Sequence, residues 1–172
     1  NARTNSHFTN MTNTGHITLT ESALTGTSTS GSIGIGGIIG YIGSKVATPI
    51  TKATSKGNIT VGGAPKCTRK GVGGIVGYAN TGGGAKYPSP ITESVVNCNI
   101  VSEITAGMGI GLKANAIATV ASTQFAGSIT RPGESKVTLS ASNFYNYIYA
   151  TVPADWTAEG YAGDYDGNIY KK

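Results

Sequence analysis

The residues best suited to chemistry in this chain are its few carboxylates, since only Glu21, Glu93, Glu103 and Glu134 precede position 137. Two glutamates in a groove beside a strand could act as the general acid and base of a polysaccharide-cleaving enzyme, and Glu93 and Glu103 could approach each other in this way. Surface glutamates are, however, far more often solvated than paired. We therefore expect no catalytic residue and treat an enzyme as the alternative.

The cysteines and remaining acids show no spacing typical of a metal or redox site. Cys67 and Cys98 permit one disulfide without demanding it, and neither belongs to a C-x-x-C pair. The segment 164–168 (DYDGN) echoes the first half of a calcium loop, but no glutamate follows at the required distance. No serine or cysteine lies in a local nucleophile motif. We expect neither a metal nor another cofactor.

Aromatic side chains are concentrated near the C-terminus, where 8 of the 13 lie in residues 144–172. Exposed tyrosine and tryptophan rings can stack on sugar rings or anchor a protein partner. Because glycines and acids separate Tyr161, Tyr165 and Tyr170, we interpret these three as candidate ligand-binding residues. The other interpretation is a cap, in which Trp156 covers the end of a core and the segment 152–156 folds back as a turn.

A repeat along the chain determines where these residues must lie. Four eleven-residue windows align without gaps, and each begins with an apolar residue and ends with a small residue, a variable polar residue, isoleucine, and threonine or valine. The variable position holds His16 in the first window, so we expect an exposed strand side chain there rather than a base or ligand. The windows are 8–18 (FTNMTNTGHIT), 50–60 (ITKATSKGNIT), 91–101 (ITESVVNCNIV) and 120–130 (VASTQFAGSIT).

A second, glycine-rich motif separates the windows. It reads IGGIIGY at 35–41, VGGIVGY at 72–78 and, in altered form, AGMGIGL at 106–112. These glycines superficially resemble a phosphate-binding loop, but no Gly-Lys-Ser/Thr follows, no helical period begins, and the motif recurs in tandem. We therefore interpret it as structural, with glycine where the chain turns a corner or where backbones approach closely.

These repeats predict an all-β fold, a single β-solenoid of about four imperfect repeats in which equivalent side chains stack. We assign residues 1–136 to the repeats and 137–172 to an aromatic-rich C-terminal cap of the same domain. Each repeat would form either two rungs or one rung with long excursions, and an immunoglobulin-like sandwich is the alternative fold. The isoleucines expected to point inward are Ile17, Ile38, Ile59, Ile75, Ile100, Ile110 and Ile129.

Charge and hydropathy exclude further classes of protein. Residues 1–136 carry a net charge of +7 and residues 137–172 one of −2, which together make the +5 of the chain. The cations are interleaved with threonine and glycine and have few aromatic neighbours, so we expect them to guard strand edges rather than bind nucleic acid. No apolar run approaches 18 residues, so we expect no transmembrane helix.

The two motifs together resemble the GLUG-type repeats of surface-exposed and secreted bacterial proteins, many of them from Bacteroides-like species. The resemblance is carried by GGIIGY at 36–41, by GGIVGY at 73–78 and by the small-x-Ile-Thr ends of the preceding windows, and it covers about residues 8–130. Members look like β-solenoids used as adhesin stalks or accessory modules. The resemblance implies an extracytoplasmic location, at the cell surface or secreted, within a larger envelope protein or complex.

We therefore expect a non-enzymatic, adhesin-like or accessory surface module that binds a glycan or protein partner or acts as a structural spacer. A polysaccharide-acting enzyme on a β-solenoid scaffold is the alternative. A third class is ice binding by a flat threonine face, which would draw on Thr18, Thr20, Thr25, Thr27 and Thr29. The second and third repeats lack the regular T-x-T pattern that this class needs.

Overall fold

The computed structural model of the chain contains strands and no helix in the residues that it describes. These residues are 5–20, 31–43, 45–63, 66–80, 87–114, 120–131, 133, 135–138, 161–163 and 168–171. Over these ranges, no helical segment has the length and apolar character needed to cross a membrane. The all-β class expected from the sequence is confirmed.

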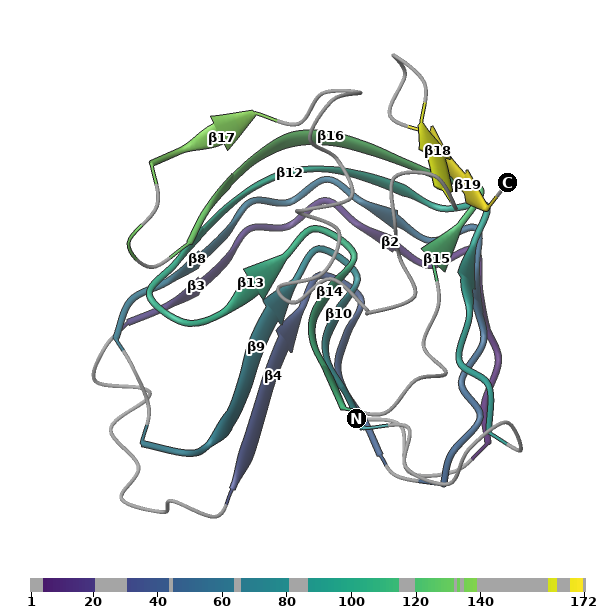
Figure 1. Cartoon of the computed structure of the whole chain (residues 1–172), viewed down its shortest axis with the longest axis horizontal. Coiled ribbons are helices and arrows are strands. Elements are labelled where there is room, and N and C mark those ends of the chain that lie inside the picture. The colour runs from purple at the N-terminus through teal and green to yellow at the C-terminus, as the bar shows by residue number, and fades with distance from the viewer. Residues whose placement is uncertain are drawn as a thin grey trace.

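The chain passes through four parallel sheets in a fixed order and then begins again (Figure 1). The side sheet contains β1 (Phe8–Thr9), β6 (Ile50–Thr51), β11 (Ile91–Thr92) and β15 (Val120–Ala121). The curved arch sheet contains β2 (Thr12–Asn13), β3 (Ile17–Leu19), β7 (Thr54–Ser55), β8 (Ile59–Val61), β12 (Val95–Ser102) and β16 (Thr123–Thr130). The first inner sheet contains β4 (Ser32–Gly36), β9 (Arg69–Gly73) and β13 (Ala106–Gly107), and the second contains β5 (Ile39–Ile42), β10 (Val76–Asn80) and β14 (Ile110–Ala114).

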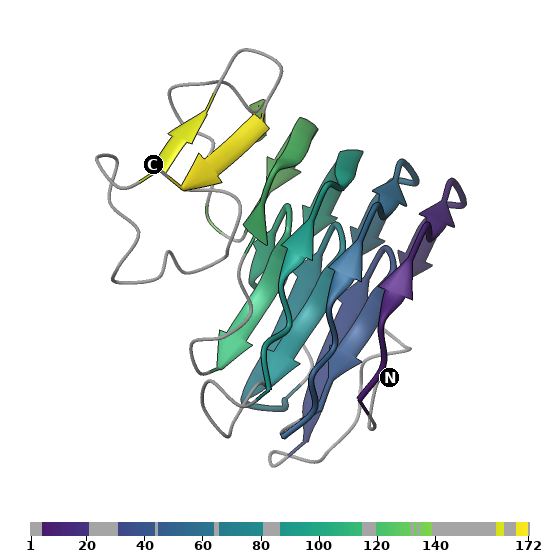
Figure 2. The same ribbon diagram turned by 90° about the vertical axis from the view of Figure 1, so that its right-hand side faces the viewer.

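Each repeat forms one turn of this path, and successive turns stack in register (Figure 2). The first turn contains β1 to β5, the second β6 to β10 and the third β11 to β14, while β15 and β16 begin a fourth. Ile50 pairs with Phe8 on one side and with Ile91 on the other, and Ile91 pairs with Val120, as the gap-free alignment requires. The arrangement is solenoid-like with one rung per repeat, and its parallel pairing excludes the antiparallel sandwich.

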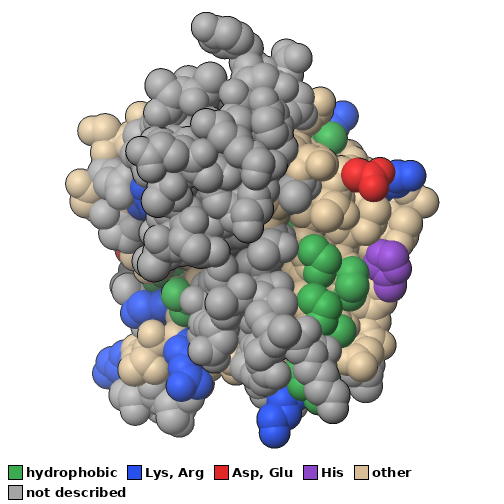
Figure 3. All heavy atoms as spheres, turned by 45° about the vertical axis from the view of Figure 1, so that its right-hand side comes forward, with side chains coloured by type: hydrophobic (Ala, Val, Ile, Leu, Met, Phe, Trp, Pro, Cys, Tyr) green, Lys and Arg blue, Asp and Glu red, His purple; other side chains and the backbone are tan. Residues whose placement is uncertain are grey.

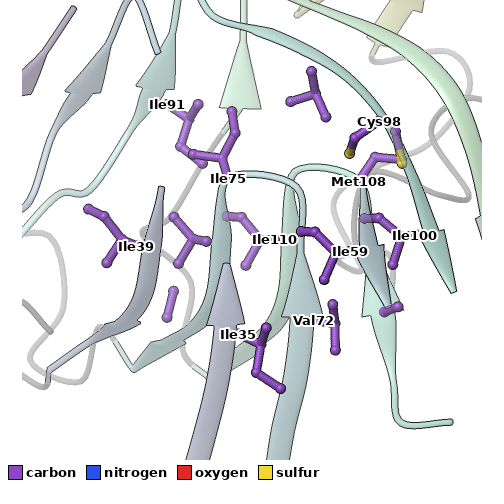
Figure 4. Close-up of a cluster of buried hydrophobic side chains, with 14 of the residues drawn as sticks. Ile35, Ile39, Ile59, Val72, Ile75, Ile91, Cys98, Ile100, Met108 and Ile110 are labelled. Carbon is purple, nitrogen blue, oxygen red and sulfur yellow. The ribbon is translucent and has the colours of Figure 1, made fainter. Parts of the chain in front are cut away.

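The core lies between the outer and inner sheets and consists of aliphatic side chains stacked along the turns (Figure 4). In the arch sheet, Ile59 pairs with Ile17 and with Ile100, and Ile100 pairs with Ile129. Ile17 and Ile38 are only partly buried, because they belong to the first turn, which has a described neighbour on one side alone. The other predicted inward residues are buried: Ile59, Ile75, Ile100, Ile110 and Ile129.

The glycine-rich motif lets the two inner sheets touch backbone to backbone. A Cβ on Gly71 would lie 2.6 Å from the carbonyl oxygen of Gly77, and a Cβ on Gly40 would lie 2.7 Å from that of Gly34. Such distances are shorter than a carbon atom tolerates, so only glycine fits. None of these four glycines has a positive φ. Close approach, and not a corner, is therefore the reason for glycine here.

The tyrosines that end this motif stack on each other in the second inner sheet. Tyr41 pairs with Tyr78, and Tyr78 pairs with Leu112 in the altered third copy. The two aromatic rings are 5.3 Å apart between centroids and tilted by 47°, a geometry that aromatic pairs favour. Burial raises the pKa of the Tyr78 phenol, with a smaller opposing effect of Arg69. Tyr78 is therefore a neutral packing residue.

One left-handed residue per turn makes the corner between the side sheet and the arch sheet. The backbone angle φ is 57° at Asn10 and Lys52, 50° at Glu93 and 48° at Ser122. This conformation is uncommon for residues other than glycine and costs each of them roughly 1–2 kcal/mol. All four side chains are exposed. The repeats thus share one backbone path even where their side chains differ completely.

Strand direction changes after β16. Two strands, β17 (Val137–Thr138) and β19 (Asn168–Lys171), pair antiparallel with β16. A third, β18 (Tyr161–Gly163), pairs antiparallel with β19. Figure 2 shows β18 and β19, in yellow, at the end of the stack opposite the first turn. Trp156, the expected centre of a cap, lies outside the described residues.

Candidate functional site

On the outer face of the arch sheet, polar side chains recur at equivalent positions of successive turns, and this is the most regular pattern of polar groups on the described surface. Side chains along a strand alternate between its two faces. In β12, Cys98 and Ile100 are buried, whereas Asn97, Asn99 and Val101 are exposed. The variable polar position of each repeat is the equivalent of Asn99: His16 is exposed there, Asn58 is partly buried, and Ser128 exposes only 4% of its surface.

His16, Asn58, Asn99 and Ser128 occupy that position, and hydrogen bonds join them across all four turns; we call them the polar ladder. The backbone N–H of Asn58 donates to His16 Nδ1 at 3.1 Å. The backbone N–H and the side-chain Nδ2 of Asn99 both donate to Asn58 Oδ1, at 2.9 and 3.3 Å. The Ser128 hydroxyl donates to Asn99 Oδ1 at 2.6 Å. His16 is exposed, as the sequence predicts, but it lies immediately before β3 and not within a strand.

Hydroxyl, amide and apolar groups continue beside the polar ladder. Two residues after the ladder position, Thr60 pairs with Thr18 on one side and with Val101 on the other. Val101 exposes 48% of its surface, and Asn97 is also exposed. The strands β2, β3, β7, β8, β12 and β16 contain no charged residue, and the nearest described charges are those of Lys56, between β7 and β8, and Glu103, directly after β12. The face therefore offers closely spaced hydrogen-bonding groups with very little charge.

The two glutamates considered as a catalytic pair lie far apart. Glu93 is at the corner that precedes β12, and Glu103 follows the last residue of that strand. The eight residues of β12 span roughly 26 Å of extended chain, so the fold does not bring the two carboxylates together. Glu93 instead lies beside Lys52, with Nζ and Oε2 3.8 Å apart and both side chains exposed. Figure 3 shows Lys and Arg side chains (blue) in several places on the described part of the surface, with an Asp or Glu side chain (red) beside one of them.

Both cysteines are buried free thiols, so the disulfide that the sequence permits is not formed. Burial raises the pKa of the Cys98 thiol to about 12, because a thiolate loses its hydration in the apolar core. A thiol that stays protonated is a poor nucleophile and metal ligand. The described residues also contain no group of three or more His, Cys, Asp or Glu side chains that could hold a metal ion.

The candidate ligand-binding tyrosines lie in the C-terminal segment. Tyr161 belongs to β18 and Tyr170 to β19, and in this antiparallel pair Tyr161 lies opposite Lys171 while Tyr170 lies opposite Ala162. The side chains of Tyr161 and Tyr170, and the whole of Tyr165, lie outside the described residues. A ligand site built from these three residues stays a prediction.

The hydrogen bonds of the polar ladder are a feature of the candidate site that the sequence pattern did not indicate. The pattern shows that the residue directly before the recurring isoleucine of each window can be any polar side chain. The available signal was the recurrence of asparagine at 58 and 99 in stacked windows, because equivalent amides one strand spacing apart can bond to each other.

Fold and face together define the class of protein: an all-β, parallel-sheet chain of solenoid-like type. No protein-family model, curated protein or solved structure matches it. The resemblance to GLUG-type repeats therefore depends on the motif residues alone.

Proposed function

We propose that this chain is a non-enzymatic bacterial surface module, adhesin-like or accessory, that binds an uncharged glycan along the outer face of the arch sheet. The polar ladder of His16, Asn58, Asn99 and Ser128 is the observation that carries the proposal. The extracytoplasmic location and the place within a larger envelope protein follow from the GLUG-type resemblance.

The chemistry of the face suits a sugar polymer. Sugars present many hydroxyl groups, which need donors and acceptors at close spacing, and apolar C–H faces, which need an apolar contact. Asn97, Asn99 and Thr60 supply the polar groups, and exposed Val101 supplies the apolar contact. The strands hold these groups in place before binding, which reduces the entropic cost of association. Since the six strands of this face contain no charged residue, an uncharged glycan fits better than an acidic one.

The positions of the carboxylates favour binding over cleavage. General acid and base groups must both reach one scissile bond. Glu93 and Glu103 lie at opposite ends of β12 and cannot meet this requirement together. The proposal therefore assigns no catalytic role to either residue.

Incubation with a panel of neutral polysaccharides, followed by binding and product analysis, tests this proposal. We expect retention of at least one polysaccharide and no shorter products. Glu93→Gln and Glu103→Gln should bind as well as the wild type. Reproducible cleavage that disappears in either variant would show that the chain is an enzyme.

The C-terminal tyrosines provide a second expected contact with the same ligand. We expect Tyr161→Ala and Tyr165→Ala to weaken binding by about tenfold, the effect of losing one stacked ring, and to leave the melting temperature nearly unchanged. Trp156→Ala should instead lower the melting temperature, since we assign this residue to the cap. If both tyrosine variants unfold as readily as the tryptophan variant, the whole segment is a cap and contributes no ligand contact.

A further inference from the structure

The stack of turns ends in open strand edges on its N-terminal side. β1, β2, β4 and β5 are the terminal strands in the pairing order of their sheets, and β3 pairs with β8 alone. Within the described ranges, no strand lies beyond them. In Figure 2 this first turn forms the right-hand end of the stack. Backbone N–H and C=O groups along such an edge can pair with another strand. We call β1 to β5 the N-terminal edge.

The backbone of β3 shows which groups face outward. The Ile17 N–H donates to the carbonyl of Asn58, and the Leu19 carbonyl accepts from the Gly62 N–H. The backbone N–H and C=O groups of Ile17 and Leu19 therefore point toward the second turn. Because successive peptide groups alternate in direction along a strand, the N–H and C=O of Thr18 point away from the stack. Thr18 also carries an exposed side chain.

The described part of the N-terminal edge carries no fully charged side chain. Residues 5–20 and 31–43 contain no Lys, Arg, Asp or Glu, although the chain has a net charge of +5. The expectation that lysines guard strand edges is wrong for this edge, because Lys52 and Lys56 lie in the second turn, between two other turns. Proteins usually protect an open edge with charge, and this edge lacks that protection.

The N-terminal edge also exposes the apolar end of the core. Phe8 and Ile17 are partly buried, whereas Ile50 and Ile59, their partners in the second turn, have no exposed surface. Met11 exposes 41% of its surface. A second open strand edge with apolar side chains, packed against this one, would bury these side chains and also pair the free backbone groups.

The opposite end of the arch sheet shows how such an edge can be completed. There β17 pairs antiparallel with Ser128 and Ile129, and β19 pairs antiparallel with Thr123 and Gln124. That end is covered by the chain itself, which argues against a head-to-tail stack of copies. A two-fold axis through the N-terminal edges of two copies would place their edge strands antiparallel, the same relation as at the covered end.

We propose that two copies of this chain associate through their N-terminal edges, with β3 of one copy antiparallel to β3 of the other, so that the arch sheets become continuous. The interface is self-complementary because each copy presents the same uncharged edge and the same apolar side chains. Among the described residues the first cation is Lys45, after β5, so repulsion between the two positive molecules acts at a distance and weakens as salt is added. Association should therefore strengthen with ionic strength.

Sedimentation equilibrium of the full chain tests the proposal. The wild type should approach twice the 17.4 kDa mass of one chain. Thr18→Lys and Thr18→Glu should each remain monomeric, because like charges would face each other across the two-fold axis. An equimolar mixture of these two variants should recover the doubled mass. Val101→Lys, with the same charge on the same face but two turns from the edge, is the matched control and should dimerise like the wild type.

Other outcomes would overturn the proposal. These are a wild type that stays at 17.4 kDa at every concentration, a Thr18→Lys variant that dimerises normally, or a mixture of the two charge variants that remains monomeric. Thermal unfolding must show that each variant is folded. Thr12→Lys and Thr12→Glu, at an exposed position of β2, provide a second charge pair with the same expected outcomes should Thr18 variants fail to fold.

Discussion

Asn99 donates both its backbone N–H and its side-chain Nδ2 to one atom, Oδ1 of Asn58, at 2.9 and 3.3 Å. Asn58→Ala removes this acceptor and should lower the free energy of unfolding by about 1 kcal/mol. Asn58→Asp keeps an oxygen in the same place and should cost less. Urea denaturation measures both values. A loss for the aspartate variant that equals the loss for alanine would contradict the acceptor role.

Gly57 and Gly15 hold the same position in successive turns but face different surroundings. A Cβ on Gly57 would overlap the carbonyl oxygen of Gly15, whereas a Cβ on Gly15 would lie 3.5 Å from Asn13 Oδ1, an ordinary contact. We expect Gly57→Ala to cost about 2 kcal/mol through overpacking, and Gly15→Ala to be nearly neutral. Thermal unfolding of the two variants provides the comparison, and similar melting temperatures would show that the turns are not stacked as described.

Ser55 and Ser94 are both buried, but only one of them is hydrogen-bonded. Ser94 Oγ donates to the Thr92 carbonyl at 2.8 Å and accepts from the Ala53 N–H at 3.0 Å. Ser55 Oγ has no partner among the described residues. Removing an unpaired buried hydroxyl stabilises a fold, so Ser55→Ala should raise the free energy of unfolding by about 1 kcal/mol, and Ser94→Ala should lower it by a similar amount. Shifts of the same sign in chemical denaturation would refute this assignment.

The pH dependence of stability should reveal the buried thiol of Cys98. Its pKa rises from 9.0 to about 12 on folding, so the folded protein holds the proton over a range in which the unfolded chain loses it. The stabilisation is fully present below pH 9 and decreases as the pH rises toward 12. At about pH 10.5 the loss should reach about 2 kcal/mol.

Cys98→Ala isolates this effect from the other groups that titrate in base. Urea unfolding near neutral pH and in base should show a smaller decrease in stability for the variant than for the wild type. The difference should be close to the 2 kcal/mol estimated above. Equal decreases for the two proteins would mean that the Cys98 thiol is accessible to water.

The stacking of the turns could be predicted from the sequence because identical residue types recur at stacked positions. Ile17, Ile59, Ile100 and Ile129 lie in four windows of the same length, and a ladder of isoleucine is what the parallel pairing produces. The path of the inner sheets could not be predicted in the same way. That path depends on contact between two segments of the same turn, such as Gly71 against the backbone at 77. A sequence repeat indicates which residues of different turns are equivalent, but it does not indicate which segments of one turn touch.

The candidate site could be predicted only in part. The repeat placed His16 at an exposed polar position, but the bonds of the polar ladder depend on the directions of the Asn58 and Asn99 amides, which the pattern does not contain. The possible approach of Glu93 to Glu103 failed because the eight residues of β12 form one continuous strand between them. The expectation of lysines at strand edges was wrong for the N-terminal edge, because composition does not reveal which turn is terminal.

The central claim is that the outer face of the arch sheet binds an uncharged glycan without cleaving it. Isothermal titration of a neutral polysaccharide into Asn97→Ala tests this most directly, since Asn97 is exposed in the middle of β12. We expect about tenfold weaker binding than for the wild type, equivalent to 1.4 kcal/mol, with an unchanged melting temperature. Glu103→Gln, beyond the end of the strand, should bind normally. Binding by Asn97→Ala at wild-type strength, or no neutral polysaccharide bound by the wild type, would contradict the claim.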